Sequence, residues 1–419
     1  MDLRQLKALE IAARFKIIYD NGLWFVPSQS SPGKSYQVTL GEPACCNCED
    51  FMLRQQDCKH IIACRLVLAR DGKGTAPVIV TDAVPKRPTY RQCWPAYNRA
   101  QATEKRRVRV LLHDLCRNLP DRQRPPKRSG PKPHLVRDMV FAMAFKVYCG
   151  LSTRRFSTDL LEAHEQGFTT RPIPGAKVSA FFEDPYFAPI LKELIGHSAR
   201  PLRAVETAFA IDSSGFGSSR FESYYDHKYN TTRHKCVWVK THIAAGVKTN
   251  VVAAVRILDK DAADCPQFVP LVKETRKHFE IGEVSADKAY ASLENFEEIA
   301  GCGGQAFIAF KSNTTGAVGG HFEKAFHYFL FKREEYLARY HKRSNVESTF
   351  SAIKRKFGHA VASKTDAAMV NEVLCKILCH NLTCLIQEQE VLGIVPVFWN
   401  DEEEQEAGDP VILPMVGAQ

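Results

Sequence analysis

Short apolar runs alternate with amphipathic stretches in the carboxyl-terminal half of the chain, which predicts an α/β domain. Strand-like runs lie at 206–211, 236–244, 250–257 and 282–286, and helical periodicity lies at 266–279. Asp212 follows the first run, and the Ser-Ser-Gly-Phe-Gly after it is expected to form a turn. The expected architecture is a mixed sheet flanked by helices.

The amino-terminal half has a different pattern, with two short strands followed by several helices. The strands are predicted at 23–29 and 35–40, and the helices at 96–119, 135–148 and 153–165. Prolines interrupt the chain between the strands and the helices. These patterns divide the chain into a small α+β module at 1–70, a Pro-rich linker at 71–95, a mainly helical region at 96–200, the α/β domain at 201–395 and a tail at 396–419.

The composition is that of a globular protein. Of 419 residues, 45% are hydrophobic and 25% are charged, which argues against a disordered or low-complexity chain. The length suggests about two or three domains. No apolar run approaches the ~18 residues that a membrane-spanning helix needs, and the amino terminus has no secretion signal. We therefore expect a cytoplasmic protein without a membrane partner.

Basic residues are concentrated in one segment. The chain has 57 Lys and Arg against 47 Asp and Glu, and residues 84–137 hold 15 of the basic residues and three of the acidic ones. A basic stripe suits contact with a phosphate backbone, which predicts a nucleic acid as the partner and Arg106, Arg107 and Arg109 as contacts. A solvated helix face with a charged linker would have the same composition.

Two neighbouring features each allow two interpretations. The helices at 135–148 and 153–165, with Arg154 and Arg155 at the start of the second, fit a helix-turn-helix and also fit ordinary helix packing. The acidic tail could compete with DNA for the basic segment, but its composition favours a disordered, solubilising end.

Four side chains near the amino terminus are spaced as zinc ligands. Cys46 and Cys48 form a C-x-C pair, and Cys58 and His60 form a C-x-H pair nine residues later. Three thiolates and one imidazole suit a closed tetrahedral Zn²⁺ site, which would contribute folding energy. Cys45 could replace Cys46 in this set. The spacing and the Cys-Lys-His-Ile ending resemble the SWIM zinc finger, a module of DNA-handling proteins and transposases.

A second group of cysteines lies near the carboxyl end. Cys375, Cys379 and Cys384, with His380 beside them, belong to an apolar helical stripe. A metal site is one interpretation, but the apolar stripe favours a buried structural helix.

Three acids are the candidates for catalysis. Asp212 and Asp287 each follow an apolar strand, where the functional groups of open α/β sheets gather, although such residues can also be plain turn or cap residues. Glu347 lies in a predicted helix, one face of which carries Tyr340, Arg343, Glu347 and Lys354. An exposed Arg–Glu pair alone would not explain the tyrosine and the lysine on that face.

The Y-x2-R-x3-E-x6-K spacing of this helix resembles the carboxyl-terminal motif of bacterial insertion-sequence transposases of the DDE class, whose catalytic core is RNase H-like. The Asp-Lys-Ala-Tyr at 287–290 and the strand before Asp212 also resemble that family. The resemblance implies that Asp212, Asp287 and Glu347 form the acidic triad and bind Mg²⁺ or Mn²⁺. It also implies that Tyr340, Arg343 and Lys354 contact substrate phosphates.

The function implied by this resemblance is transposition. Such an enzyme binds the terminal inverted repeats of its element, cleaves double-stranded DNA by two-metal-ion chemistry and joins the freed 3′ ends to target DNA. It would act as a homodimer on paired ends, associated with the bacterial nucleoid. Only 59 residues separate Asp287 from Glu347, which leaves no room for the long inserted β domain of some members. The alternatives are an inactive zinc-dependent DNA-binding regulator and an RNase H-like nuclease.

Overall fold

The computed structural model describes residues 3–29, 34–71, 93–122, 133–219, 237–258, 262–311, 314 and 318–399. The chain divides into two compact units, one of Met1–Arg87 with Ala309–His341 and one of Pro88–Ile308 with Lys342–Gln419. Most of the linker predicted at 71–95, and residues 400–419 of the predicted acidic tail, lie outside the described residues.

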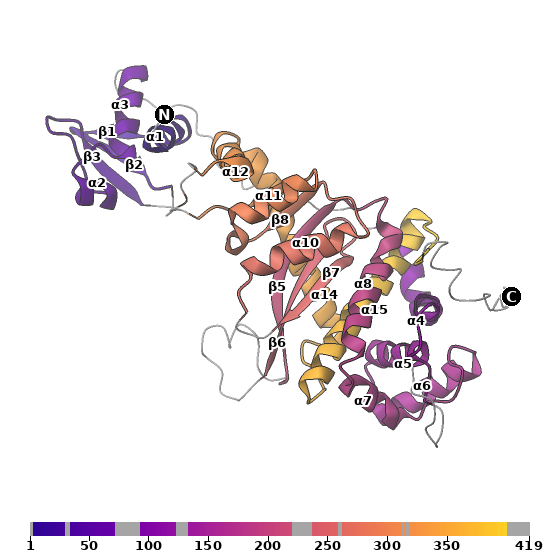
Figure 1. Ribbon diagram of the computed structural model, residues 1–419. Helices are drawn as coiled ribbons and strands as arrows, with labels where there is room; N and C mark the ends of the chain where they lie inside the picture. Colours follow the sequence, from indigo (N-terminus) through magenta and orange to yellow (C-terminus); the bar gives the residue numbers. More distant parts are fainter. Residues whose placement is uncertain are drawn as a thin grey trace. The chain divides into compact units, whose positions relative to one another are not determined.

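The first unit contains a small antiparallel sheet with helices beside it (Figure 1). Its described strands are β1 (Ile18–Asp20), β2 (Leu23–Pro27), β3 (Ser35–Thr39) and β4 (Cys45–Cys46), paired in that order. The helices are α1 (Leu3–Arg14), α2 (Glu49–Arg54) and α3 (Lys59–Asp71). Alternate strand residues such as Trp24, Val26 and Val38 are buried in a core with Ile11 and Ile61, as expected for a sheet with one covered face. This architecture confirms the predicted α+β module.

Two aromatic-rich helices also belong to the first unit, α12 (Gly320–Phe331) and α13 (Arg333–Tyr340). The Phe310 ring contacts those of Phe322 and Phe326, with centroids 5.3 and 5.2 Å away. Arg333 of α13 forms an ion pair with Glu10 of α1 at 3.5 Å. Residues that are far apart in sequence therefore pack in one unit.

The second unit is built on a mixed sheet whose described strands follow the order β7-β6-β5-β8-β9 (Figure 1). The strands are β5 (Ala208–Gly217), β6 (Trp238–Gly246), β7 (Val252–Leu258), β8 (Glu283–Ala286) and β9 (Gln305–Ile308). The first three pair antiparallel, whereas β8 pairs parallel with both β5 and β9. The mixed α/β architecture predicted from the sequence is confirmed.

Helices surround this sheet. They are α4 (Trp94–Cys116), α5 (Val136–Cys149), α6 (Thr153–Glu165), α7 (Gly175–Glu183), α8 (Phe187–Ala199), α10 (Phe268–Arg276), α11 (Leu293–Gly301), α14 (Ser344–Phe357) and α15 (Asp366–Leu392). α10 packs on β6 and β7, and α14 packs on β5 and β6. α15 contacts α4, α5, α7 and α8, so it links the helical region to the sheet domain.

The long helix α15 is a core helix. It is the one described helix that is long and apolar enough to cross a membrane, but 78% of its most apolar window is buried inside the protein. The Cys379 thiol donates a hydrogen bond to the Ala144 carbonyl at 3.2 Å, and His380 Nε2 lies 2.9 Å from the Asn250 carbonyl oxygen. These contacts confirm the structural interpretation of the cysteine-rich stretch.

The turn predicted after Asp212 is wrong. β5 continues through Asp212 to Gly217, because β6 supplies a backbone partner at every position up to the Gly217–Trp238 pair. Asp212 therefore lies within the strand and pairs with Ile243. The small residues at 213–215 favour a turn by their local preference, and the long-range pairing with β6 makes them part of a strand instead.

The single helix predicted to carry Tyr340, Arg343, Glu347 and Lys354 is also wrong. α13 ends at Tyr340, a 3-10 turn covers His341–Arg343, and α14 begins at Ser344. A 3-10 turn keeps nearly helical dihedral angles, so the spacing of side chains does not reveal the break. Tyr340 belongs to the first unit and the other three residues to the second.

Candidate active site and zinc centre

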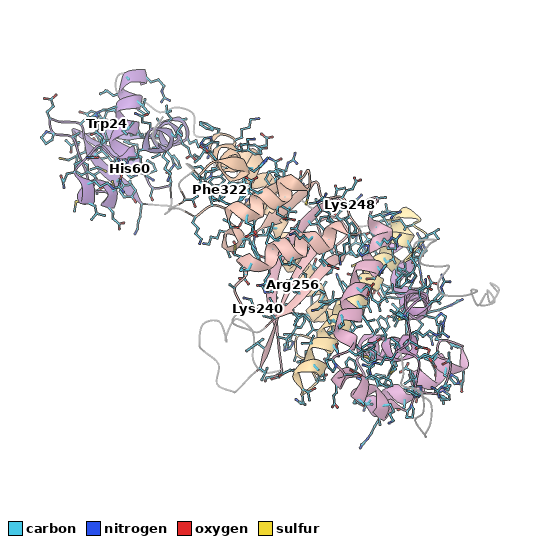
Figure 2. All side chains as sticks on the ribbon, viewed as in Figure 1. Trp24, His60, Lys240, Lys248, Arg256 and Phe322 are labelled. Carbon is cyan, nitrogen blue, oxygen red and sulfur yellow. The ribbon has the colours of Figure 1, made fainter. Side chains whose placement is uncertain are left out.

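The zinc-ligand candidates of the first unit meet at the end of its small sheet. Cys46 lies in β4, Cys48 caps the start of α2, and Cys58 and His60 lie at the start of α3. All four are buried, and their ligand atoms lie within 4.8 Å of one another. Figure 2 labels His60 and Trp24 in this unit. Among the described residues, no other group of His, Cys, Asp or Glu brings its ligand atoms together in this way.

The geometry of this cluster fits a tetrahedral Zn²⁺ ion. His60 Nδ1 lies 3.8 Å from the Sγ atoms of both Cys46 and Cys58. Sulfur and nitrogen ligands at ~2.3 and ~2.1 Å from one ion would be separated by roughly 3.6 Å. A hydrogen bond from the Cys46 thiol lowers the pKa of Cys58 to about 3, which favours the thiolate that zinc binds. Cys45 is exposed and outside the cluster, so Cys46 is the better ligand.

Asp212 lies in β5, and Asp287 lies directly after the neighbouring strand β8. β5 and β8 pair in parallel with Ile211 opposite Ala286, so the next residue along the chain is an aspartate in both cases. Asp212 Oδ1 accepts a hydrogen bond from the Ser213 amide at 2.8 Å, and Asp287 caps the 3-10 turn Lys288–Tyr290 through the Lys288 amide at 2.8 Å. Both carboxylates are therefore held by their own backbone.

Glu347 joins this pair through Arg343. Arg343 precedes α14, and its Nη1 lies 3.5 Å from Asp212 Oδ2 and 3.0 Å from Glu347 Oε1. One guanidinium therefore bridges a strand acid and a helix acid. All three predicted acids lie in the second unit, and the charges of Asp287 and Glu347 both act on Asp212.

The negative charge of Asp212 is energetically unfavourable at this position. Burial raises the pKa of Asp212 to about 6, and the charges of Asp287 and Glu347 add to the rise. The Ser213 amide and Arg343 act in the opposite direction. A partly buried cluster of like charges is stabilised by a cation, and carboxylate oxygens are the ligands that Mg²⁺ and Mn²⁺ prefer.

An open cavity of about 710 Å³ lies beside these acids, between β5 and α14. Asp212 and Glu347 line it together with polar and basic residues: Ser213, Ser214, Ser351, Lys354, Arg355 and His359. The Lys354 amine donates a hydrogen bond to Ser214 Oγ at 2.7 Å, and burial lowers the pKa of Lys354 to about 8. Ser214 and His359 carry no signal in the sequence, because only the packing of α14 on β5 brings them to the site. Arg355 carried a signal, as part of the Lys354-Arg355-Lys356 run.

The three arginines predicted to bind DNA have different surroundings on α4. Arg106 is exposed. Arg107 pairs with Glu390 of α15 at 2.6 Å and donates a hydrogen bond to Gln389 at 2.8 Å. The Arg109 guanidinium lies 5.9 Å from the centre of the Phe168 ring, and its buried Nε has no hydrogen-bond partner among the described residues. Their contact with DNA stays a prediction, as does that of Tyr340.

Two known families match the parts of the chain that contain these sites. Residues 203–382 match the family described as the transposase DDE domain, a range that includes Asp212, Asp287 and Glu347. This segment is therefore similar to a transposase DDE domain. Residues 36–63 match the SWIM zinc finger and include all four zinc-ligand candidates, so the resemblance to a DDE transposase with a SWIM finger is confirmed. No curated protein matches the chain.

These assignments have two consequences. The SWIM match and the geometry of the Cys and His side chains together support structural zinc in the first unit. The transposase domain and the zinc finger both indicate DNA as the partner of the protein.

Proposed function

We propose that the protein is a DNA transposase that binds the terminal inverted repeats of its element, cleaves the DNA and joins the freed 3′ ends to a target. The observation that carries this proposal is the parallel pairing of β5 with β8. It places Asp212 and Asp287 next to each other, and Arg343 links Asp212 to Glu347. The catalytic triad is therefore Asp212, Asp287 and Glu347.

The fold of the catalytic domain is RNase H-like in this proposal. Three antiparallel strands followed by two parallel ones, with the first strand central, support this assignment. The first acid lies within the central strand β5, and the last lies on α14, which packs against that strand. The three carboxylates thus come from three separate elements of one domain.

The triad would hold two divalent cations, Mg²⁺ or Mn²⁺. When bound, such ions activate a water or 3′ hydroxyl and stabilise the oxygen that leaves phosphorus. Asp212 would hold them together with Asp287 and Glu347, because the charges of both other acids act on its carboxylate. Arg343 then exchanges its carboxylate contacts for a substrate phosphate oxygen, which it can bind through two N–H groups.

The cavity beside the triad holds the DNA strand that is cut. Lys354 and Arg355 face the cavity and supply positive charge to the phosphates, and Ser214 fixes the Lys354 amine. Tyr340 contacts the same substrate by stacking on a base or by a hydrogen bond. On α4, Arg106, Arg107 and Arg109 contact the backbone of the inverted repeats. The SWIM module contributes to DNA handling, and two protomers pair the two ends in the cytoplasm, at the nucleoid.

The proposed function is tested with the DNA that flanks the protein's own gene. We expect cleavage at the two ends of the element in the presence of Mg²⁺, mapped at nucleotide resolution, and joined products when target DNA is added. Cleavage without joining would assign the protein to the RNase H-like nucleases. Binding of the ends without cleavage would identify an inactive regulator.

Binding of DNA by Lys354 should depend on pH. Its pKa is lowered to about 8 in the free protein, and a bound phosphate favours the charged amine. Complex formation therefore takes up a proton above pH 8, so the affinity should fall as pH rises, by about fivefold between pH 8 and 9 at most. Fluorescence anisotropy on a duplex with the mapped cleavage site measures this, and Lys354→Arg should remove the dependence. An equal pH dependence in both proteins would refute this role of Lys354.

The exposed and the paired arginine of α4 should respond differently to substitution. Arg106→Gln should weaken DNA binding and reduce the slope of log K against log salt by about one, without a change in stability. Arg107→Gln should in addition lower the free energy of unfolding, because it removes the contacts with Glu390 and Gln389. Salt-dependent binding and urea unfolding measure both effects. Equal stability losses would contradict the assignment.

A further inference from the structure

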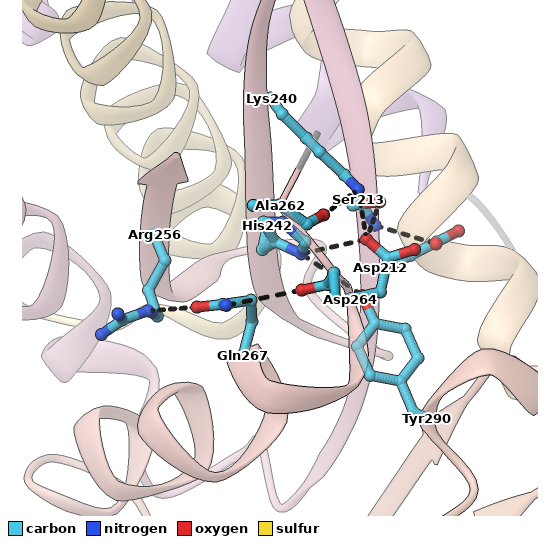
Figure 3. Close-up of polar contacts among 10 residues, drawn as sticks. Asp212, Ser213, Lys240, His242, Arg256, Ala262, Asp264, Gln267 and Tyr290 are labelled. Atoms are coloured by element: carbon cyan, nitrogen blue, oxygen red, sulfur yellow. Dashed lines mark hydrogen bonds and ion pairs between the residues drawn. The ribbon is translucent and has the colours of Figure 1, made fainter. Parts of the chain in front are cut away.

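A largely buried polar network begins at Ser213, which lines the cavity but directs its hydroxyl to Asp264, away from Asp212 and Ser214. Along β5, side chains alternate between the two faces, so Asp212 and Ser214 face α14 whereas Ser213 faces the side of α10. Ser213 pairs across the strands with His242 of β6, and His242 pairs with Arg256 of β7. These side chains, with Lys240 of the same strand as His242, form a polar row under the segment that leads into α10 (Figure 3).

Asp264 is the centre of this network. Its Oδ1 forms an ion pair with the Lys240 amine at 2.7 Å, accepts a hydrogen bond from the Ser213 hydroxyl at 3.2 Å and lies 3.7 Å from His242 Nδ1. The Lys240 amine also donates to the Ala262 carbonyl at 2.7 Å. Figure 3 shows Lys240, Ser213 and His242 directed toward Asp264. The carboxylate therefore binds one side chain from each of two adjacent strands, Lys240 and Ser213, and lies close to His242.

The network also reaches the turn that carries Asp287. Tyr290 ends this turn and is buried, and its hydroxyl lies 3.5 Å from His242 Nδ1. The Tyr290 amide donates to the Asp287 carbonyl at 2.9 Å, and Asn295 donates to the Tyr290 carbonyl at 2.7 Å. One end of the network is thus bonded to the residue after Asp212, and the other end to the turn that begins at Asp287.

A gain in the free energy of folding does not by itself explain such a network. Lys240 is 8% exposed and His242 is fully buried. Removing a Lys–Asp pair from water costs about as much as the pair returns, and apolar residues of similar size often stabilise a protein more. A bonded polar network instead fixes the positions of the groups it joins, although His242 Nε2 has no hydrogen-bond partner among the described residues. The groups joined here are the backbone segments of two metal-ligand candidates.

We propose that Asp264, held by Lys240, is a positioning residue that fixes β5 and the 287–290 turn relative to each other and so sets the spacing of Asp212 and Asp287 for divalent cations. This inference rests on the proposed function, because it assumes that these two acids bind metal. Asp264 acts through Ser213 and through His242 and Tyr290, and it contacts neither the metal nor the DNA.

The test measures binding of Mn²⁺ alone to the zinc-loaded, full-length protein by electron paramagnetic resonance. Loss of a second layer of contacts around a metal site typically weakens metal binding ~10–100-fold. We therefore expect Asp264→Asn to raise the Kd for Mn²⁺ by about tenfold or more. Arg256→Met is the matched control, because Arg256 lies on the same face but bonds to Gln267 at 2.9 Å instead of Asp264. It should leave the Kd unchanged.

The double variant Lys240→Met/Asp264→Leu separates positioning from stability. It replaces the partly buried ion pair by apolar groups, so the melting temperature should stay near that of the wild type while Mn²⁺ binding stays weak. Wild-type Mn²⁺ affinity in the folded double variant would overturn the proposal.

The Asp212→Asn variant shows how much of the Mn²⁺ binding depends on the triad. If Asp212→Asn weakens Mn²⁺ binding and Asp264→Asn does not, only the positioning role fails. If neither does, the metal site of the proposed function fails as well.

Discussion

Asp212→Asn should abolish metal-dependent DNA cleavage, with a loss of at least about 1,000-fold in rate. The substitution removes the central negative charge of the triad and leaves an amide, which is a weak ligand for Mg²⁺. It also removes the link between Arg343 and the strand acid. Two-metal-ion chemistry depends on both the activation of the nucleophile and the stabilisation of the leaving oxygen, so both contributions are lost together.

The fold should survive this substitution. The pKa of Asp212 is raised to about 6, so at neutral pH the folded protein carries a charge that its surroundings disfavour. Neutralising it should leave the melting temperature unchanged or slightly higher, and DNA binding should remain. Asp366→Asn, at an exposed position at the start of α15, is the matched control and should cleave normally. Cleavage by Asp212→Asn at more than a tenth of the wild-type rate would contradict the triad.

Cys58→Ser should remove bound zinc and unfold the amino-terminal module. Cys58 lies in the centre of the cluster, and the cluster is part of the hydrophobic core of the first unit. Zinc binding contributes roughly 10–16 kcal/mol in small zinc modules near pH 7, which exceeds the stability of such a module without metal. Zinc content by mass spectrometry and amide hydrogen exchange over residues 3–71 measure the two effects. Chelation of zinc should give the same exchange pattern.

Cys45→Ser is the control for this experiment. Cys45 is adjacent to the ligand Cys46 but is exposed and outside the cluster. The variant should keep one zinc per chain and the wild-type exchange pattern. If Cys45→Ser lost zinc and Cys46→Ser retained it, Cys45 would be the zinc ligand in place of Cys46.

Local sequence signals predicted the parts of the site that depend on spacing alone. The zinc ligands follow a short C-x-C and C-x-H pattern, so their convergence needs only a strand end and the start of a helix. Asp287 lies directly after β8, as the apolar run before it indicates. Helix α6 has the predicted limits, Thr153–Glu165, because its periodicity is local.

The parts that depend on long-range packing could not be predicted from the sequence. β5 extends past Asp212 because β6 pairs with it, and no local feature of Ser213 and Ser214 shows this. Asp264 is separated from Ser213 by 51 positions and carries no motif, so its contact with Ser213 exists only in the folded sheet. The break between α13 and α14 keeps the helical spacing and is therefore invisible in the pattern.

The measurement that tests the account most directly is strand transfer by the purified protein. A duplex ending at the mapped cleavage site is incubated with a circular target plasmid and Mg²⁺, and the junctions are sequenced. We predict that the 3′ end of the duplex is joined to the plasmid by the wild-type protein and the Asp366→Asn control, and by none of the Asp212, Asp287 or Glu347 variants. Plasmid cutting without junctions, or junctions formed by a triad variant, would contradict the assignment of this protein as a DDE transposase.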